Sequence, residues 1–154
     1  MSETAGEVGR FRSGFLVGIV LLVIQFLLGM AVNLFVTVPK EHPGSNPQEY
    51  FSGVAQSVTW AILHGPPLLV LHAIVGLALA ITGFGVVYRA VKLRRRGIIW
   101  ASSTGAVAIL GAGLNGGSFL NYHEDFSSML MASFFAIAVI AYAAGLYVSG
   151  TEST

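Results

Sequence analysis

The sequence predicts an all-α integral membrane protein, a four-helix bundle of up-down-up-down connectivity with a short amphipathic interfacial helix in its first loop. Of the 154 residues, 55% are hydrophobic and 10% are charged, whereas soluble domains carry about 25% charged residues. Four apolar segments approach the roughly 20 residues that a helix needs to cross a bilayer. The alternating strands of about 10 residues that build outer-membrane barrels are not visible. The length suits a single domain, residues 1–154.

The four predicted spans are residues 15–38, 66–88, 98–114 and 126–148. The first contains no charged residue and exceeds the ~7–15 residues of a signal-peptide core. No small-x-small cleavage site follows it, so we expect it to be retained. The second begins at Pro66 and Pro67, and proline suits the first helical turn because its missing N–H would have no partner there. The third is the most polar and is expected to end at Gly116 and Gly117.

Basic residues give the predicted orientation. All of the eight lysines and arginines except Lys40 precede the first span or lie between the second and third spans. These residues are Arg10, Arg12, Arg89, Lys92, Arg94, Arg95 and Arg96. Because loops rich in lysine and arginine stay in the cytoplasm, both tails, residues 1–12 and 150–154, are predicted to be cytoplasmic. The predicted location is a bacterial-type cytoplasmic (inner) membrane, crossed several times.

The first loop contains a segment with helical periodicity. Apolar side chains recur at Phe51, Val54, Ala55, Val58, Ala61 and Ile62. Polar residues stand between them, and Tyr50 and Trp60 add aromatic rings. A short helix with this pattern is expected to lie in the membrane interface or to cover one end of the bundle.

The composition excludes several kinds of cofactor site. The chain has no cysteine, which excludes disulfides, cysteine-ligated iron–sulfur clusters and covalently attached c-type haem. No P-loop lysine or dinucleotide fingerprint accompanies the glycines. The run Arg94-Arg95-Arg96 sets topology and attracts anionic lipid headgroups, and we predict no binding of nucleic acid.

The histidines carry the one chemical prediction. They are His42, His64, His72 and His123, and all four fall toward the non-cytoplasmic side of the predicted topology. His72 lies within the apolar run LLVLHAIVGLAL. Ionisable groups at such depth face the bundle interior and mark functional sites, and neutral imidazole is a common ligand of transition metals. Gly76 and Gly83 share its helix face and would make room for a haem ring, although close helix packing uses the same small residues. The alternative role of His72 is a hydrogen bond to a neighbouring helix.

A second ligand must come from another helix at matching depth, with each residue adding about 1.5 Å. Two arrangements remain open. In one, a haem b lies between the second and fourth spans, ligated by His72 and by His123 or Met131. In the other, His64 and His123 form a shallower metal or proton site, helped by the acidic pair that follows His123.

Two stretches carry a resemblance to a known family. The first span contains QFLLGMAVNLF, residues 25–35, which resembles the helix that opens the second half of heme A synthase. The histidine of LVLHAIVGLAL, His72, resembles the haem-ligating histidine of that family's next helix. The resemblance implies one four-helix half of such an enzyme, with haem ligands on its second and fourth helices. The family's second ligand falls near Ser127, Ser128 and Met129, slightly after His123. The chain is also similar to small uncharacterised four-helix bacterial membrane proteins that end with an NG-SFLNY stretch, here residues 115–122.

The leading functional prediction is a small b-type cytochrome-like protein. It would transfer single electrons to or from a quinone or another membrane redox partner rather than act as a stand-alone enzyme. The first alternative is a cofactor-free accessory or scaffold subunit of a larger membrane complex. The second is a transporter or channel subunit with a polar path along Gln25, Asn33, His72 and Asn115. The lipid bilayer is a partner in all three.

Overall fold

The computed structural model describes residues 2–151, with the side chains of residues 9–150. This part of the chain forms five helices and no strand: α1 (Ser2–Phe35), α2 (Tyr50–His64), α3 (Pro67–Leu93), α4 (Arg96–Tyr122) and α5 (Asp125–Thr151). The all-α prediction is confirmed. Residues 152–154 of the predicted C-terminal tail lie outside the described residues.

Four of the helices are long and apolar enough to cross a membrane: Gly9–Phe35, Pro67–Leu93, Arg96–Tyr122 and Asp125–Gly150. By the length and composition of these helices, the chain is a multi-pass membrane protein. The two largest differences from the predicted spans are at the start of α1 and at the end of α4. The described part of the predicted N-terminal tail is helical, because α1 begins at Ser2. α4 continues through Gly116 and Gly117, since the cost of about 1 kcal/mol for a helical glycine is offset where Gly117 lies buried against Val54 of α2.

Local sequence explains where several helices begin and end. The Glu49 carboxylate accepts hydrogen bonds from two backbone N–H groups in the first turn of α2, the ordinary role of an N-cap side chain. Pro67 opens α3, as expected for a residue that lacks the N–H. Arg94 and His123 end α3 and α4 in the left-handed conformation, with φ of 57° and 56°. The next helix begins two residues after each of them.

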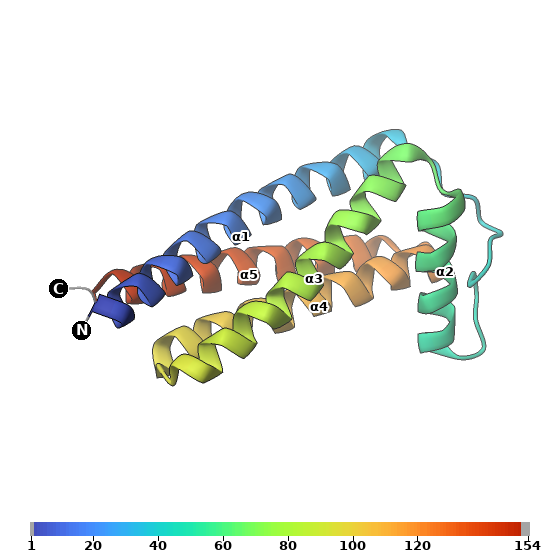
Figure 1. Cartoon of the computed structure of the whole chain (residues 1–154). Helices are drawn as coiled ribbons and strands as arrows, with labels where there is room; N and C mark the ends of the chain where they lie inside the picture. The colour runs from blue at the N-terminus through green and yellow to red at the C-terminus, as the bar shows by residue number, and fades with distance from the viewer. Residues whose placement is uncertain (1, 152–154) are drawn as a thin grey trace.

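The four long helices form a bundle with α2 lying across one end of it (Figure 1). α1 packs beside α3 and α5, and α4 packs beside the same two helices. α2 contacts α3 and α4. The start of α1 and the end of α5 lie at the end of the bundle opposite α2. We call residues 36–64, which comprise the loop after α1 together with α2, the end cap.

Two groups of buried side chains hold these helices together. The larger joins all four long helices and includes Phe15, Leu79, Ile98 and Tyr142. The Tyr142 ring lies 5.5 Å from the ring of Phe15 and faces Gly105, where a Cβ atom would collide with it. The smaller group lies where the end cap meets the bundle and consists of Val32, Ala61, Leu69 and Leu120. Large apolar side chains also cover the outside of the bundle, as lipid requires, and they include Leu34, Trp100 and Ile140.

Candidate functional site

His72 faces α1 through a direct contact with Gln25. The side-chain nitrogen of Gln25 donates to the backbone carbonyl of His72 at 3.1 Å and lies 3.4 Å from Nε2 of its ring. An amide nitrogen is a donor only, so the ring nitrogen that faces it acts as the acceptor and the proton resides on Nδ1. The pair therefore joins α1 to α3 within two apolar spans.

Two glycines make this contact possible. A Cβ atom at Gly29 of α1 would lie 2.9 Å from Cε1 of the His72 ring, and one at Gly76 of α3 would lie 2.9 Å from Nε2 of Gln25. Each glycine thus opens the space that the polar side chain of the other helix fills. Gly76 and Gly83 form the face of α3 that was predicted to contact a haem ring. The Gln25 side chain fills the space beside Gly76, and side chains of α4 and α5, among them Tyr142, fill the space beside Gly83.

Gln25 and His72 do not use all of their hydrogen-bonding atoms. Nδ1 of His72 and Oε1 of Gln25 are buried without a hydrogen-bond partner among the described residues. Unpaired polar atoms in an apolar environment are costly, by roughly 1–3 kcal/mol each. This residual polarity is the feature of the pair that would suit a further ligand.

The other predicted ligands have contacts of their own. His123 ends α4, and Nε2 of its ring lies 3.2 Å from the Pro39 carbonyl oxygen in the end cap. Met131 of α5 lies against Gly116 of α4, where its sulfur would be 3.4 Å from a Cβ atom. The backbone of α3 lies beside α1, α2 and α4, and the Tyr142 side chain of α5 reaches α3 at Gly83. None of the contacts of His72 given above involves His123 or Met131.

The two histidines of the shallower predicted site have different neighbours. His64 is exposed and lines a hollow of about 320 Å³ on α2, with Pro43 and Trp60. The histidine beside His123 is instead His42, with ring centroids 6.1 Å apart. Among the described residues, no group of three or more histidine, aspartate and glutamate side chains could hold a metal ion.

The predicted polar path is also dispersed. Asn33 is exposed on α1, one helical turn beyond Gly29. Asn115 donates to the Gly111 carbonyl of its own helix at 2.8 Å. Of the four residues proposed for the path, only Gln25 and His72 meet.

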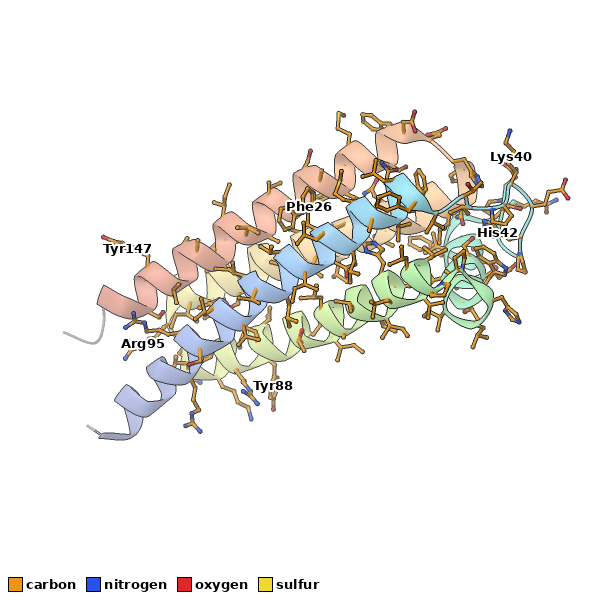
Figure 2. The ribbon with its side chains drawn as sticks, turned by 90° about the horizontal axis from the view of Figure 1, so that it is seen from above. Phe26, Lys40, His42, Tyr88, Arg95 and Tyr147 are labelled. Atoms are coloured by element: carbon orange, nitrogen blue, oxygen red, sulfur yellow. The ribbon has the colours of Figure 1, made fainter. Side chains whose placement is uncertain are left out.

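The end cap holds a set of contacts that the sequence did not reveal. The His42 ring stacks on Trp60, with centroids 4.3 Å apart and planes inclined by 12°. Its Nδ1 lies 3.0 Å from the Pro43 carbonyl oxygen, and its Nε2 lies 3.1 Å from the Leu120 carbonyl oxygen of α4. Figure 2 shows His42 and Lys40 at this end of the molecule, away from Tyr88, Arg95 and Tyr147. The adjacent aromatic and histidine types were visible in the sequence, but the fold of the loop that joins them was not.

Asn121 is the second residue that sequence reasoning missed. Its side chain is fully buried, and its backbone carbonyl accepts a hydrogen bond from the N–H of Asn46 at 2.9 Å. Its side-chain amide and the Ser57 hydroxyl are 2.6 Å apart. The SFLNY stretch was noted in the sequence, and its asparagine anchors both the loop and α2 to the end of α4.

No protein-family model, no curated protein and no solved structure matches the chain. The resemblance to one half of heme A synthase therefore stays a prediction.

Proposed function

We propose that the chain crosses a bacterial-type cytoplasmic membrane in an up-down-up-down arrangement, with both termini on the cytoplasmic side and the end cap at the opposite interface. Two features support this orientation. Arg95 lies at one end of the bundle and His42 at the other (Figure 2), and the basic cluster of residues 89–96 surrounds the turn between α3 and α4. Basic residues gather on the cytoplasmic side of membrane proteins. The exposed side chains of Phe51 and Leu63 on α2 suit an interfacial helix.

As the molecular function, we propose a cofactor-free accessory or scaffold subunit of a larger membrane complex. The observation that carries this proposal is the contact of Gln25 with His72, in which the embedded histidine serves to join α1 to α3. The side chains of His72 and Gln25 fill the spaces beside Gly29 and Gly76. Polar side chains of this kind commonly hydrogen-bond between membrane helices.

The surface between α4 and α5 supports a contact with another subunit. A hollow of about 370 Å³ on this face is lined by Trp100, Val107, Phe134 and the hydroxyl residues Ser103 and Thr104. Trp100 is 73% exposed and Val107 is 66% exposed. Small and hydroxyl residues are enriched where membrane helices meet. We propose a transmembrane helix of a partner subunit as the occupant of this hollow.

A photo-crosslinking residue at Val107 tests this surface, with one at Ile81 of α3 as the control. Ile81 is similarly exposed at 64% but does not line the hollow. In cells, we expect a protein adduct of one defined mass from position 107 and lipid adducts alone from position 81. Lipid adducts alone at both positions would contradict the subunit proposal.

Haem b binding at His72 is our second proposal, because Nδ1 of this membrane-embedded ring is buried without a partner. Nδ1 could ligate iron only in the other tautomer, with the proton on Nε2, and Gln25 would then have to turn its side-chain oxygen toward Nε2. A haem held by His72 together with His123 or Met131 would require His123 to leave the Pro39 carbonyl or Met131 to leave Gly116. A bound haem would supply one-electron chemistry, with a quinone or a membrane redox partner as the reactant.

A visible spectrum separates the two proposals. Protein purified in mild detergent from haem-replete cells is expected to be colourless and to show no Soret band. The His72→Ala variant should have the same spectrum. A Soret band that is lost in His72→Ala and kept in His64→Ala would replace the scaffold proposal with haem binding, since His64 is exposed on α2.

A further inference from the structure

His42 lies where the end cap meets α4, and both nitrogens of its ring face carbonyl oxygens. Nδ1 is 3.0 Å from the oxygen of Pro43 in the loop, and Nε2 is 3.1 Å from the oxygen of Leu120 near the end of α4. A carbonyl oxygen only accepts hydrogen bonds, so each nitrogen can bond only if it carries a proton.

The protonated ring alone satisfies both contacts. Neutral imidazole has one N–H and one lone pair, whereas imidazolium has two N–H groups. The ring also stacks on Trp60 at 4.3 Å, and an indole face attracts a cation. A neutral His42 would leave one nitrogen lone pair directed at a carbonyl oxygen and would lose the cation–π attraction. We propose that protonated His42 holds the end cap against α4. We call its contacts with Pro43, Trp60 and Leu120 the clasp.

The clasp connects three segments. The N–H of His42 donates to the Ser45 hydroxyl at 3.3 Å, and that hydroxyl donates to the His42 carbonyl at 2.9 Å, so the backbone makes a tight turn from His42 to Ser45. Trp60 belongs to α2, and Leu120 belongs to α4. Protonation of one side chain therefore strengthens contacts between the loop, α2 and α4 together.

Other ionisable groups belong to the segments that meet at the end cap. They are Lys40 and Glu41 in the loop, His64 on α2, His123 at the end of α4, and Glu124 and Asp125 at the start of α5. Of these, His123 has a ring contact with His42, and its Nε2 lies 3.2 Å from the Pro39 carbonyl. That nitrogen needs a proton for its bond, which the neutral ring supplies with its one N–H. His42 is the histidine whose two ring nitrogens both face acceptors.

The end cap should respond to pH, because proton binding to His42 and closure of the end cap onto α4 favour each other. Because the closed clasp holds a proton on each ring nitrogen, lower pH favours the closed end cap. Loss of one proton from the His42 ring at higher pH removes one hydrogen bond and the charge, and the end cap loosens. The clasp itself does not depend on the proposed orientation, which decides only the compartment whose pH would act on it.

Nitrogen-15 NMR of the histidine side chains of the wild-type chain in detergent micelles tests the clasp directly. Over about pH 5 to 8, the range in which histidine changes charge, we expect His42 to carry protons on both nitrogens at the acidic end and on one at the basic end. The amide signal of Asn46, which bonds to the Asn121 carbonyl, should shift with the same midpoint. A His42 ring with a single proton throughout the range, with the end cap still folded, would overturn the proposal.

Trp60 fluorescence provides the second measurement, in a Trp100→Phe background that leaves one tryptophan. An imidazolium stacked on the indole quenches it, so emission should rise sigmoidally with pH. His42→Gln should lose this rise, because glutamine does not titrate. The matched control His64→Gln should keep the rise in emission. His64 is exposed and lines the same hollow as Trp60, but its ring does not stack on the indole. An unchanged rise in a folded His42→Gln protein would contradict the clasp. If His42→Gln does not fold, the wild-type NMR result decides.

Discussion

The side-chain amide of Asn121 and the hydroxyl of Ser57 meet at 2.6 Å, at a point where both residues are fully excluded from solvent. When the amide nitrogen is turned toward Ser57, it also faces the carbonyl oxygens of Gly117 at 3.2 Å and Gly44 at 3.1 Å. One side chain at the end of α4 thus reaches both the loop and α2. The end cap is fixed to the bundle by this buried polar centre as well as by apolar contacts.

Replacing Asn121 with alanine should therefore destabilise the protein. The change leaves the Ser57 hydroxyl and the Gly44 carbonyl buried with fewer partners, at a cost of about 1–3 kcal/mol. The free energy of unfolding in detergent measures the effect. Asn115→Ala is the control, since Asn115 bonds only to the Gly111 carbonyl of its own helix, and a change within about 0.5 kcal/mol is expected there. Equal losses in the two variants would contradict the anchoring role of Asn121.

Gly105 is expected to tolerate no side chain. A Cβ atom at this position would collide with the Tyr142 ring, and overpacking a close contact costs about 1–3 kcal/mol. Gly113 lies on the same helix, and a Cβ atom there would have no neighbouring atom within 4 Å. Gly113→Ala should be neutral or should stabilise by up to about 1 kcal/mol through helix propensity. Thermal unfolding of both variants in the same detergent measures the difference, and a neutral Gly105→Ala would refute this account of the α4–α5 contact.

The positions of the helices could be predicted because hydropathy and periodicity are local properties of the sequence. Long apolar runs indicated the four spans, and apolar spacing indicated the helix of the first loop, observed as α2 (Tyr50–His64). The end of α4 could not be predicted from Gly116 and Gly117. Whether a helix continues through a glycine depends on its packing against residues distant in the chain, such as Val54 beside Gly117.

The pairing of side chains was the part that the sequence could not supply. Helix rise places His72 and Met131 at comparable depth, but it says nothing about the direction in which each helix face turns. In the structure, His72 turns toward Gln25 and Met131 turns toward Gly116. The contact of His42 with Trp60 depends on how an irregular loop folds back, and no periodicity describes such a loop.

A double-mutant cycle tests the contact of Gln25 with His72. Gln25→Leu and His72→Leu each remove one partner, and their effects on the free energy of unfolding should not add. Hydrogen-bonded pairs between membrane helices give coupling energies of roughly 0.6 kcal/mol, with values up to about 1.7 kcal/mol. The bond from Gln25 to the His72 backbone carbonyl survives in His72→Leu, so the cycle reports only the 3.4 Å contact with the ring, and we expect the coupling at the lower end. A coupling of zero would mean that the two side chains do not interact.

Cysteine labelling can test the orientation without interference, because the chain contains no cysteine of its own. Gln48→Cys places a thiol in the exposed loop of the end cap, and Arg96→Cys places one at the exposed start of α4. A membrane-impermeant maleimide added to spheroplasts should label position 48 and leave position 96 unlabelled, because basic residues hold the turn between α3 and α4 in the cytoplasm. Labelling of position 96 after the membrane is permeabilised is the control for its accessibility. The reverse pattern in intact spheroplasts would invert the proposed topology and place the His42 clasp in the cytoplasm.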